Sequence, residues 1–128
     1  MGRLFGTNGV RGVVGEEMTP ELALGLGHAL ASHLAPGAKV AVGTDARTSG
    51  AMLKAAMIAG LLSGGASVLD TGVVPTPALQ YFVKRRSDVL AGVLITASHN
   101  PPEFNGIKFI ESDGTEMASE TELSLIHI

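Results

Sequence analysis

The feature that most constrains the fold is the alternation of short apolar runs with longer helical patterns. The segments "KVAVG" (39–43), "ASVLD" (66–70) and "VLAGVLIT" (89–96) have the length and apolar character of buried strands, and a helical pattern precedes each of them. Strands that are covered by helices on both faces are apolar along nearly their whole length, as these are. The sequence therefore predicts an α/β domain, a three-layer α/β/α sandwich with a mostly parallel, mixed sheet.

Three helices are expected between these strands. The first begins at Thr19 and Pro20, which suit the cap and the first helical position, and it carries a leucine at every fourth residue. The second covers about residues 49–62 and stops at a pair of glycines. The third opens on another Thr-Pro pair at Thr76 and closes on three consecutive cations at 84–86, which we interpret as a solvated helix end rather than a binding patch.

Composition and charge exclude several classes of protein. The chain has 128 residues, 45% of them hydrophobic, which fits one domain with its own core. It lacks both a run of roughly 18 apolar residues and the apolar segment of a secretory signal, so we expect a cytoplasmic protein without a membrane partner. A net charge of -3 with only 9 Lys and Arg offers no broad basic face to a nucleic acid, and the absence of Cys excludes disulfides and thiolate metal sites.

Polar chemistry is concentrated where the last apolar strand ends, in "TASHNPPEFNGIK" (96–108). Ser98 is a candidate nucleophile or phosphate carrier, although a turn whose polar groups satisfy one another fits equally well. A serine hydrolase is disfavoured, because the G-x-S-x-G elbow is absent and His99 is too close in sequence to act as a well-aimed base. Lys108 follows a turn signal and could point back over this loop, or be solvated at the start of a strand.

Two further segments contain candidate anion-binding groups. In "FGTNGVRG" (5–12) three glycines surround Arg11, and because no strand pattern leads into the segment we expect a loop there. Arg11 could bind a phosphate or pair with a surface carboxylate. "GTDARTSG" (43–50) leads from a strand into a helix whose first amides could attract an anion, but from this segment alone we favour a simpler interpretation, in which Asp45 and Arg47 pair with each other and Ser49 caps the helix.

Four motifs, in this order, resemble the first domain of the α-D-phosphohexomutases: "GTNGVRG", "GTDARTSG", "PTPAL" (75–79) and "TASHNPPEFNGIKF". The resemblance covers residues 3–117, and the last motif is specific by itself. The opening segment, "NGIKF" and the nearby "DGT" look most like phosphoglucosamine mutases, with the phosphoglucomutase/phosphomannomutase group close behind.

The resemblance implies that Ser98 carries a phosphoryl group, donates it to a hexose phosphate and recovers one from the resulting bisphosphorylated sugar. The 6-phosphate and 1-phosphate of the hexose are thereby interconverted. It also implies that Lys108 is a general acid and base, that Arg11 stabilises charge, and that Mg²⁺ is bound through the phosphate of Ser98. The residues that would shape the loop or touch substrate or phosphate are His99, Asn100 and Arg47.

The resemblance also divides the chain. Residues 1–117 would form the domain, whereas the tail 118–128 departs from the family's continuation and is expected to be truncated or non-native. The family's Asp-rich metal loop, sugar loop and distal phosphate loop have no counterpart here, and "ESDGTE" (111–116) is expected to be a hairpin turn instead. The expected partners are therefore hexose phosphate, hexose 1,6-bisphosphate and the remaining domains of a full-length enzyme.

The favoured substrate pair is glucosamine 6-phosphate and glucosamine 1-phosphate. Two alternatives stay open at this stage. One is a phosphoglucomutase or phosphomannomutase, and the other is a stand-alone sugar-phosphate-binding module that performs no turnover.

Overall fold

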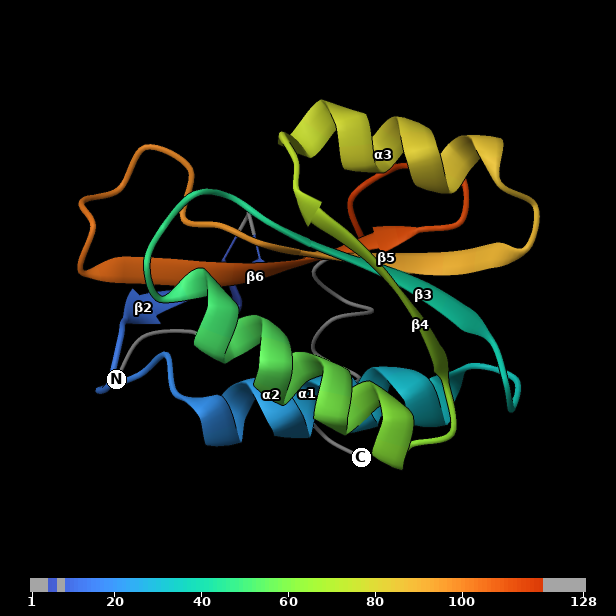
Figure 1. The fold of residues 1–128 in the computed structure, drawn as a ribbon, viewed down its shortest axis with the longest axis horizontal. Coiled ribbons are helices and arrows are strands. Elements are labelled where there is room, and N and C mark those ends of the chain that lie inside the picture. The colour runs from blue at the N-terminus through green and yellow to red at the C-terminus, as the bar shows by residue number, and fades with distance from the viewer. Residues whose placement is uncertain (1–4, 7–8, 119–128) are drawn as a thin grey trace.

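A mixed sheet forms the middle layer of the molecule (Figure 1). The computed structural model describes residues 5–6 and 9–118. The sheet has six strands in the order β1-β2-β6-β5-β3-β4: β1 (Phe5–Gly6), β2 (Gly9–Val13), β3 (Lys39–Thr44), β4 (Ser67–Val73), β5 (Val89–Ile95) and β6 (Phe104–Glu111). Strand β3 pairs in parallel with β4 and β5, whereas β6, β2 and β1 are added in antiparallel pairings.

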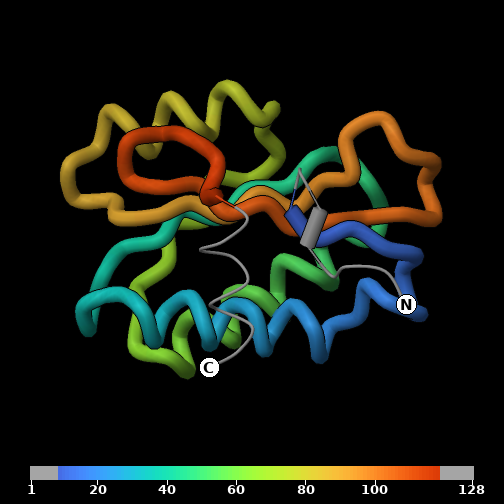
Figure 2. The backbone as a smooth tube through the Cα atoms, turned by 180° about the vertical axis from the view of Figure 1, so that it is seen from behind, coloured from blue at the N-terminus to red at the C-terminus, as the bar shows by residue number. Residues whose placement is uncertain are grey.

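Helices cover both faces of this sheet. Helices α1 (Pro20–His33) and α2 (Gly50–Ser63) lie below it in Figure 1, and α3 (Thr76–Arg85) lies above it. Figure 2 shows the same three layers from behind. The predicted α/β/α sandwich with a mixed sheet is therefore confirmed, although its antiparallel part is larger than the apolar runs indicated.

The larger core lies between the sheet and the α1–α2 layer. The leucines predicted to form one stripe on α1 face this core, with Leu26 and Leu30 buried and Leu22 and Leu34 packed at its margin. Burial of one such side chain stabilises the fold by about 1.5–3 kcal/mol. A second, smaller core lies under α3, where Leu79 and other apolar side chains meet the opposite face of the sheet.

The start of α1 and the end of α2 agree with the sequence, whereas the starts of α2 and α3 do not. The Thr19 hydroxyl accepts a hydrogen bond from the Leu22 amide at 3.1 Å, and Gly65 takes a φ of 96° just after α2, as predicted. Thr76 is the first residue of α3 rather than its cap, because Pro75 occupies the cap position. None of the helices in the described part of the chain is long and apolar enough to cross a bilayer.

The loop expected around Arg11 was a wrong prediction, because these residues form strands. Strands β1 and β2 make an antiparallel hairpin, and β2 continues the sheet beside β6, with Arg11 opposite Gly106. Gly9 takes a φ of 83° and lies so close to the Ile107 carbonyl that no larger residue fits. The strand partner lies far along the chain, so no local pattern indicated this pairing.

The hairpin turn predicted after β6 is confirmed. The Glu111 amide donates to the Thr115 carbonyl at 2.8 Å, and an antiparallel bridge joins Ile110 to Glu116. Gly114 takes the left-handed conformation that a turn of this kind requires, with a φ of 88°. Most of the predicted tail, 119–128, lies outside the described residues, so its boundary stays a prediction.

Gly27 in α1 and Gly60 in α2 set the distance between these helices, because a Cβ on either would meet the backbone of the other helix, and this suggests a stability test. A Cβ on Gly27 would lie 2.6 Å from the Met57 carbonyl oxygen and 3.0 Å from the Leu61 amide. Gly27→Ala should therefore force the helices apart and lower the free energy of unfolding by about 1–3 kcal/mol, measured by denaturant titration. Gly25→Ala, in the same helix with no atom within 4 Å of the added Cβ, should instead stabilise the chain by up to about 1 kcal/mol. Equal effects of the two substitutions would contradict this account of the packing.

Candidate functional site

The candidate site lies at the carboxyl ends of β3 and β5. These strands are parallel neighbours, so the loops that follow them, 45–49 and 96–103, leave the sheet at the same edge. The Asp45 amide donates to the Ile95 carbonyl at 3.1 Å, which ties the first loop to the end of β5. Four of the candidate residues from the sequence lie on these two loops, and the structure brings the loops together; they are Arg47, Ser98, His99 and Asn100.

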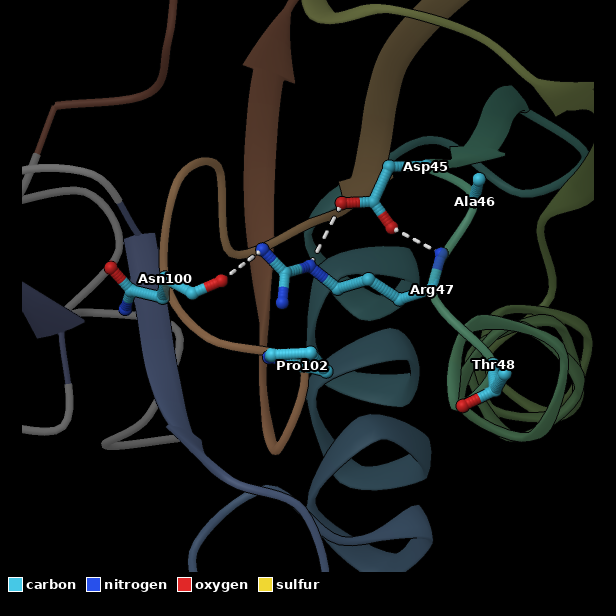
Figure 3. A pocket seen from close by; sticks show the side chains of 6 residues that line it. All are labelled: Asp45, Ala46, Arg47, Thr48, Asn100 and Pro102. Atoms are coloured by element: carbon cyan, nitrogen blue, oxygen red, sulfur yellow. Dashed lines mark hydrogen bonds and ion pairs between the residues drawn. The ribbon is translucent and has the colours of Figure 1, made fainter.

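The side chain of Arg47 lies at the centre of the second loop (Figure 3). Its Nε donates to the Asp45 carboxylate at 3.1 Å. Its two terminal nitrogens donate to four backbone carbonyls of the loop, those of Ser98 (2.9 Å), Asn100 (2.7 Å), Pro101 (2.8 Å) and Phe104 (3.2 Å).

These contacts use all the donors that a guanidinium has, which is five. The Arg47 side chain is also only 13% exposed. A phosphate could bind it only by displacing a loop carbonyl. Of the two roles expected for Arg47, the geometry therefore favours shaping the loop over direct contact with substrate.

Asp45 connects Arg47 to the backbone of Ser98. One carboxylate oxygen accepts from the Arg47 amide at 3.1 Å, and the other accepts from the Thr96 hydroxyl at 2.7 Å. Because this bond occupies the hydroxyl proton, the Thr96 oxygen presents a lone pair to the Ser98 amide, which donates to it at 3.0 Å. Thr96, which the sequence analysis did not single out, thus links the carboxylate to the candidate nucleophile.

Ser98 has an unusual backbone conformation. Its φ is 58°, and within the described residues no other non-glycine residue has a positive φ. A side chain in this region costs of order 1–3 kcal/mol, so the surroundings must hold it there. The Thr96 hydroxyl and the Arg47 guanidinium hold the amide and the carbonyl of Ser98, while the Ser98 side chain is exposed to solvent.

Arg11 lies on the face of the sheet that also carries α3. It is paired with Gly106, and a Cβ on Gly106 would lie 2.9 Å from the Arg11 Cγ, so this glycine makes room for the arginine stem. The Arg11 Nε is buried and has no hydrogen-bond partner in the described part of the chain. The alternative of a surface ion pair for Arg11 therefore has no support from the geometry.

Lys108 lies on the same face, in the middle of β6 rather than at the start of a strand. It is opposite Leu94, four residues before Ser98, and lies two residues, or about 7 Å, along β6 from Gly106. Only 8% of the residue is exposed, and its Nζ forms an ion pair with Glu116 at 3.3 Å. Sequence analysis did not identify Glu116 as a partner, because the pairing depends on how the turn after β6 folds back.

The other candidate residues have separate positions. His99 is exposed, and the Asn100 side chain points away from Arg47 in Figure 3 while its backbone closes a turn onto Ala97. Ser49 makes no side-chain cap for α2; instead its hydroxyl accepts a hydrogen bond from the buried Asn105 side chain at 2.8 Å. This contact joins the start of β6 to the start of α2.

An open depression of about 460 Å³ lies between the two loops. It is lined by Asp45, Ala46, Arg47, Thr48, Asn100 and Pro102 (Figure 3). Across residues 5–6 and 9–118 there is no group of three or more His, Cys, Asp or Glu side chains that could hold a metal ion. Asp45 is already engaged by Arg47 and Thr96, so the described residues provide no metal centre of their own.

The role of Arg47 can be tested by substitution with lysine. A lysine carries its three donors on a single nitrogen. It therefore cannot reach both the Asp45 carboxylate and the four backbone carbonyls that the three nitrogens of the guanidinium contact. Arg47→Lys should lower the free energy of unfolding by about 2–3 kcal/mol and should speed amide hydrogen exchange in 97–104, measured by mass spectrometry. Arg86→Lys, at an exposed ion pair with Asp88, should change neither quantity appreciably. Unchanged exchange in 97–104 after Arg47→Lys would exclude this role.

The strained conformation of Ser98 predicts an unusual order of stabilities. Glycine has no penalty at this φ, whereas alanine retains it. After allowance for the greater freedom of glycine in the unfolded chain, Ser98→Gly should be more stable than Ser98→Ala by about 1 kcal/mol. Differential scanning calorimetry measures this difference, and a less stable glycine variant would show that the backbone is not strained.

Comparison with known proteins relates this geometry to a family. The chain matches the family model of phosphoglucomutase/phosphomannomutase, alpha/beta/alpha domain I, over residues 2–128. It is 50% identical over 127 residues to a phosphoglucosamine mutase of Dictyoglomus turgidum, covering 98% of this chain and 28% of that protein. It is also 52% identical over 126 residues to a phosphopentomutase of Thermococcus kodakarensis, covering 98% of this chain and 27% of that protein.

A solved structure gives the same result. A phosphoglucomutase/phosphomannomutase family protein from Burkholderia thailandensis superposes with a TM-score of 0.85 at 32% identity, over 97% of this chain and 29% of that one. The chain thus spans somewhat more than a quarter of the length of the proteins it matches. The resemblance inferred from four motifs is confirmed, and the chain belongs to the phosphoglucomutase/phosphomannomutase family, in which it corresponds to the α/β/α domain I of a phosphohexomutase.

Proposed function

We propose that this domain carries the phosphoserine of an enzyme that interconverts hexose 6-phosphate and hexose 1-phosphate, with Ser98 as the phosphorylated residue. One observation supports this more than any other. In a chain of this family, Ser98 is the residue held in a strained conformation at the carboxyl edge of the sheet with its hydroxyl exposed. Strain that a structure maintains around an exposed nucleophile is typical of functional sites.

The reaction needs Ser98 both to release and to accept a phosphoryl group. In the first half, the bond between phosphorus and the Ser98 oxygen breaks and a bond from phosphorus to a sugar hydroxyl oxygen forms, while that hydroxyl loses its proton and the released Ser98 oxygen gains one to become a hydroxyl again. The bisphosphorylated sugar then reorients, and the second half returns its other phosphoryl group to Ser98. Such transfers proceed through loose transition states, so positioning and charge neutralisation supply most of the acceleration.

Two cations would supply part of that neutralisation. Arg11 stays protonated and has a buried Nε without a partner in the described residues, which suits a charge stabiliser. Lys108 can exchange a proton, so we assign to it the transfer of a proton to and from the sugar oxygen. His99 and Asn100, beside Ser98 on the loop, would contact substrate or phosphate, while Arg47 holds the loop in shape.

A magnesium ion would add to this neutralisation when bound. A phosphate on Ser98 would offer it an oxygen ligand of the kind that Mg²⁺ prefers. The described residues lack a cluster of three candidate ligands, so they do not form a magnesium site by themselves. The other ligands would have to come from another part of the enzyme.

The choice of sugar rests on the relatives. Phosphoglucosamine mutases are prominent among them, which favours glucosamine 6-phosphate and glucosamine 1-phosphate as the substrate pair. A protein named phosphopentomutase is equally similar over this domain, so the domain itself does not select the sugar. The remaining domains of the enzyme would do so, together with binding the distal phosphate.

The proposal is tested by intact-mass analysis of the complete enzyme after incubation with a hexose 1,6-bisphosphate. We expect one phosphoryl group, located on Ser98 by peptide mapping. Ser98→Ala should prevent both the modification and the isomerisation, because it removes the accepting oxygen. Ser87→Ala, which changes another exposed serine before β5, should affect neither.

Two results would contradict the proposal. A protein that binds the sugar phosphate but stays unmodified would be a binding module without turnover. A phosphoryl group that persists in Ser98→Ala would place the acceptor elsewhere.

A further inference from the structure

The ammonium of Lys108 is a buried charge that needs a partner. Only 8% of the residue is exposed, and the acidic group paired with its Nζ is the Glu116 carboxylate at 3.3 Å. Arg11 lies on the same face of the sheet and adds a second positive charge nearby. Removal of the carboxylate would leave two cations on this face, and an uncompensated buried charge is unfavourable.

Glu116 reaches Lys108 because the turn after β6 folds back on that strand. Strand β6 ends at Glu111, and the backbone bridge between Ile110 and Glu116 returns the chain beside it. The Met117 amide then donates to the Phe109 carbonyl at 2.9 Å. These two contacts fix the backbone at Glu116 and at the next residue. The Glu116 side chain therefore extends from a fixed point of the backbone.

The turn is itself rigid. The Asp113 carboxylate accepts hydrogen bonds from the Thr115 hydroxyl at 2.6 Å and from the Thr115 amide at 3.0 Å, and these bonds lower the pKa of Asp113. The turn also packs against α3, since a Cβ on Gly114 would lie 2.8 Å from the Gln80 carbonyl oxygen and 3.0 Å from the Lys84 Cβ. The turn that precedes Glu116 therefore lies between β6 and α3.

We infer that Glu116 is a positioning residue for the reaction, whose carboxylate orients the Lys108 ammonium for the proton transfer assigned to that lysine. This inference rests on the proposed function. A lysine side chain has four rotatable bonds in its stem, so burial alone would still allow the ammonium to occupy several positions. The ion pair with Glu116, which follows a rigid turn, restricts the ammonium to positions within reach of that carboxylate. Ordering a catalytic group in this way can accelerate the reaction of a bound substrate.

The test compares two glutamates of the same hairpin in the complete enzyme. Glu116→Gln removes the charge and keeps the shape of the side chain, while Glu111→Gln makes the same change at an exposed position at the end of β6. We expect Glu116→Gln to lower kcat about 10- to 100-fold with KM changed less than about twofold, because orientation rather than substrate binding is lost. Glu111→Gln should leave both constants unchanged.

A double-mutant cycle separates positioning from a general structural effect. In a Lys108→Met background, Glu116→Gln should cause no further loss of kcat, because the group that it positions is already absent. Glu116→Asp should restore part of the lost kcat. Equal kcat values for Glu116→Gln and Glu111→Gln, or additive losses in the cycle, would overturn the inference.

Failure of the proposed function gives a different result. The phosphoryl content of Ser98, measured by intact mass in the same preparations, should be the same in the parent enzyme and in Glu116→Gln. A parent enzyme without phosphate on Ser98 would reject the proposed function and, with it, this role for Glu116. A phosphorylated parent with an unaffected Glu116→Gln variant would reject the role of Glu116 alone.

Discussion

The guanidinium of Arg47 donates hydrogen bonds to Asp45 and to four carbonyls of the loop after β5, so one side chain fixes the backbone that presents Ser98. The loop after β5 makes two backbone hydrogen bonds of its own, from the Asn100 amide to the Ala97 carbonyl and from the Phe104 amide to the Pro101 carbonyl, but its two prolines have no amide hydrogen to donate, so its other carbonyls need donors from elsewhere. Arg47 satisfies them from inside, and the energy of these charge-assisted bonds can offset the strain at Ser98. The loop is therefore a preformed part of the site, and Ser98 lies exposed on it.

The mixed sheet explains how the two cations come to lie on one face of the sheet. The parallel strands β3 and β5 bring the two loops to one edge, as the general rule for such sheets predicts. Strands β6 and β2 then run antiparallel beside β5 and place Lys108 and Arg11 on the same face. The parallel part of the sheet thus positions Ser98, the proposed nucleophile, and the antiparallel part positions the positive charges.

Sequence patterns predicted the elements well where a single segment contains the whole signal. The apolar runs, the Thr19 cap and the glycines after α2 each act within a few residues, and the structure has the strands and helices they indicated. The wrong prediction near the amino terminus, a loop where β2 forms, occurred because the signal for that strand is not local. Strand β2 is stabilised by pairing with β6 over a long sequence separation, so its glycine-rich segment resembled a loop. Similarly, the role proposed for Ser98 could be inferred from its motif, whereas the contacts of Thr96 and Glu116 could not, because each depends on a partner from another element.

The sequence by itself determined the layered α/β architecture, the family and the residue types available for phosphoryl transfer, since periodicity and short motifs are local properties. Only the tertiary structure decided how those residues are used. It satisfied the donors of Arg47 inside the loop, left the Nε of Arg11 without a partner in the described part of the chain, and paired Lys108 with Glu116. These outcomes depend on which charges are brought together and removed from water, and that is set by packing between segments distant in the sequence.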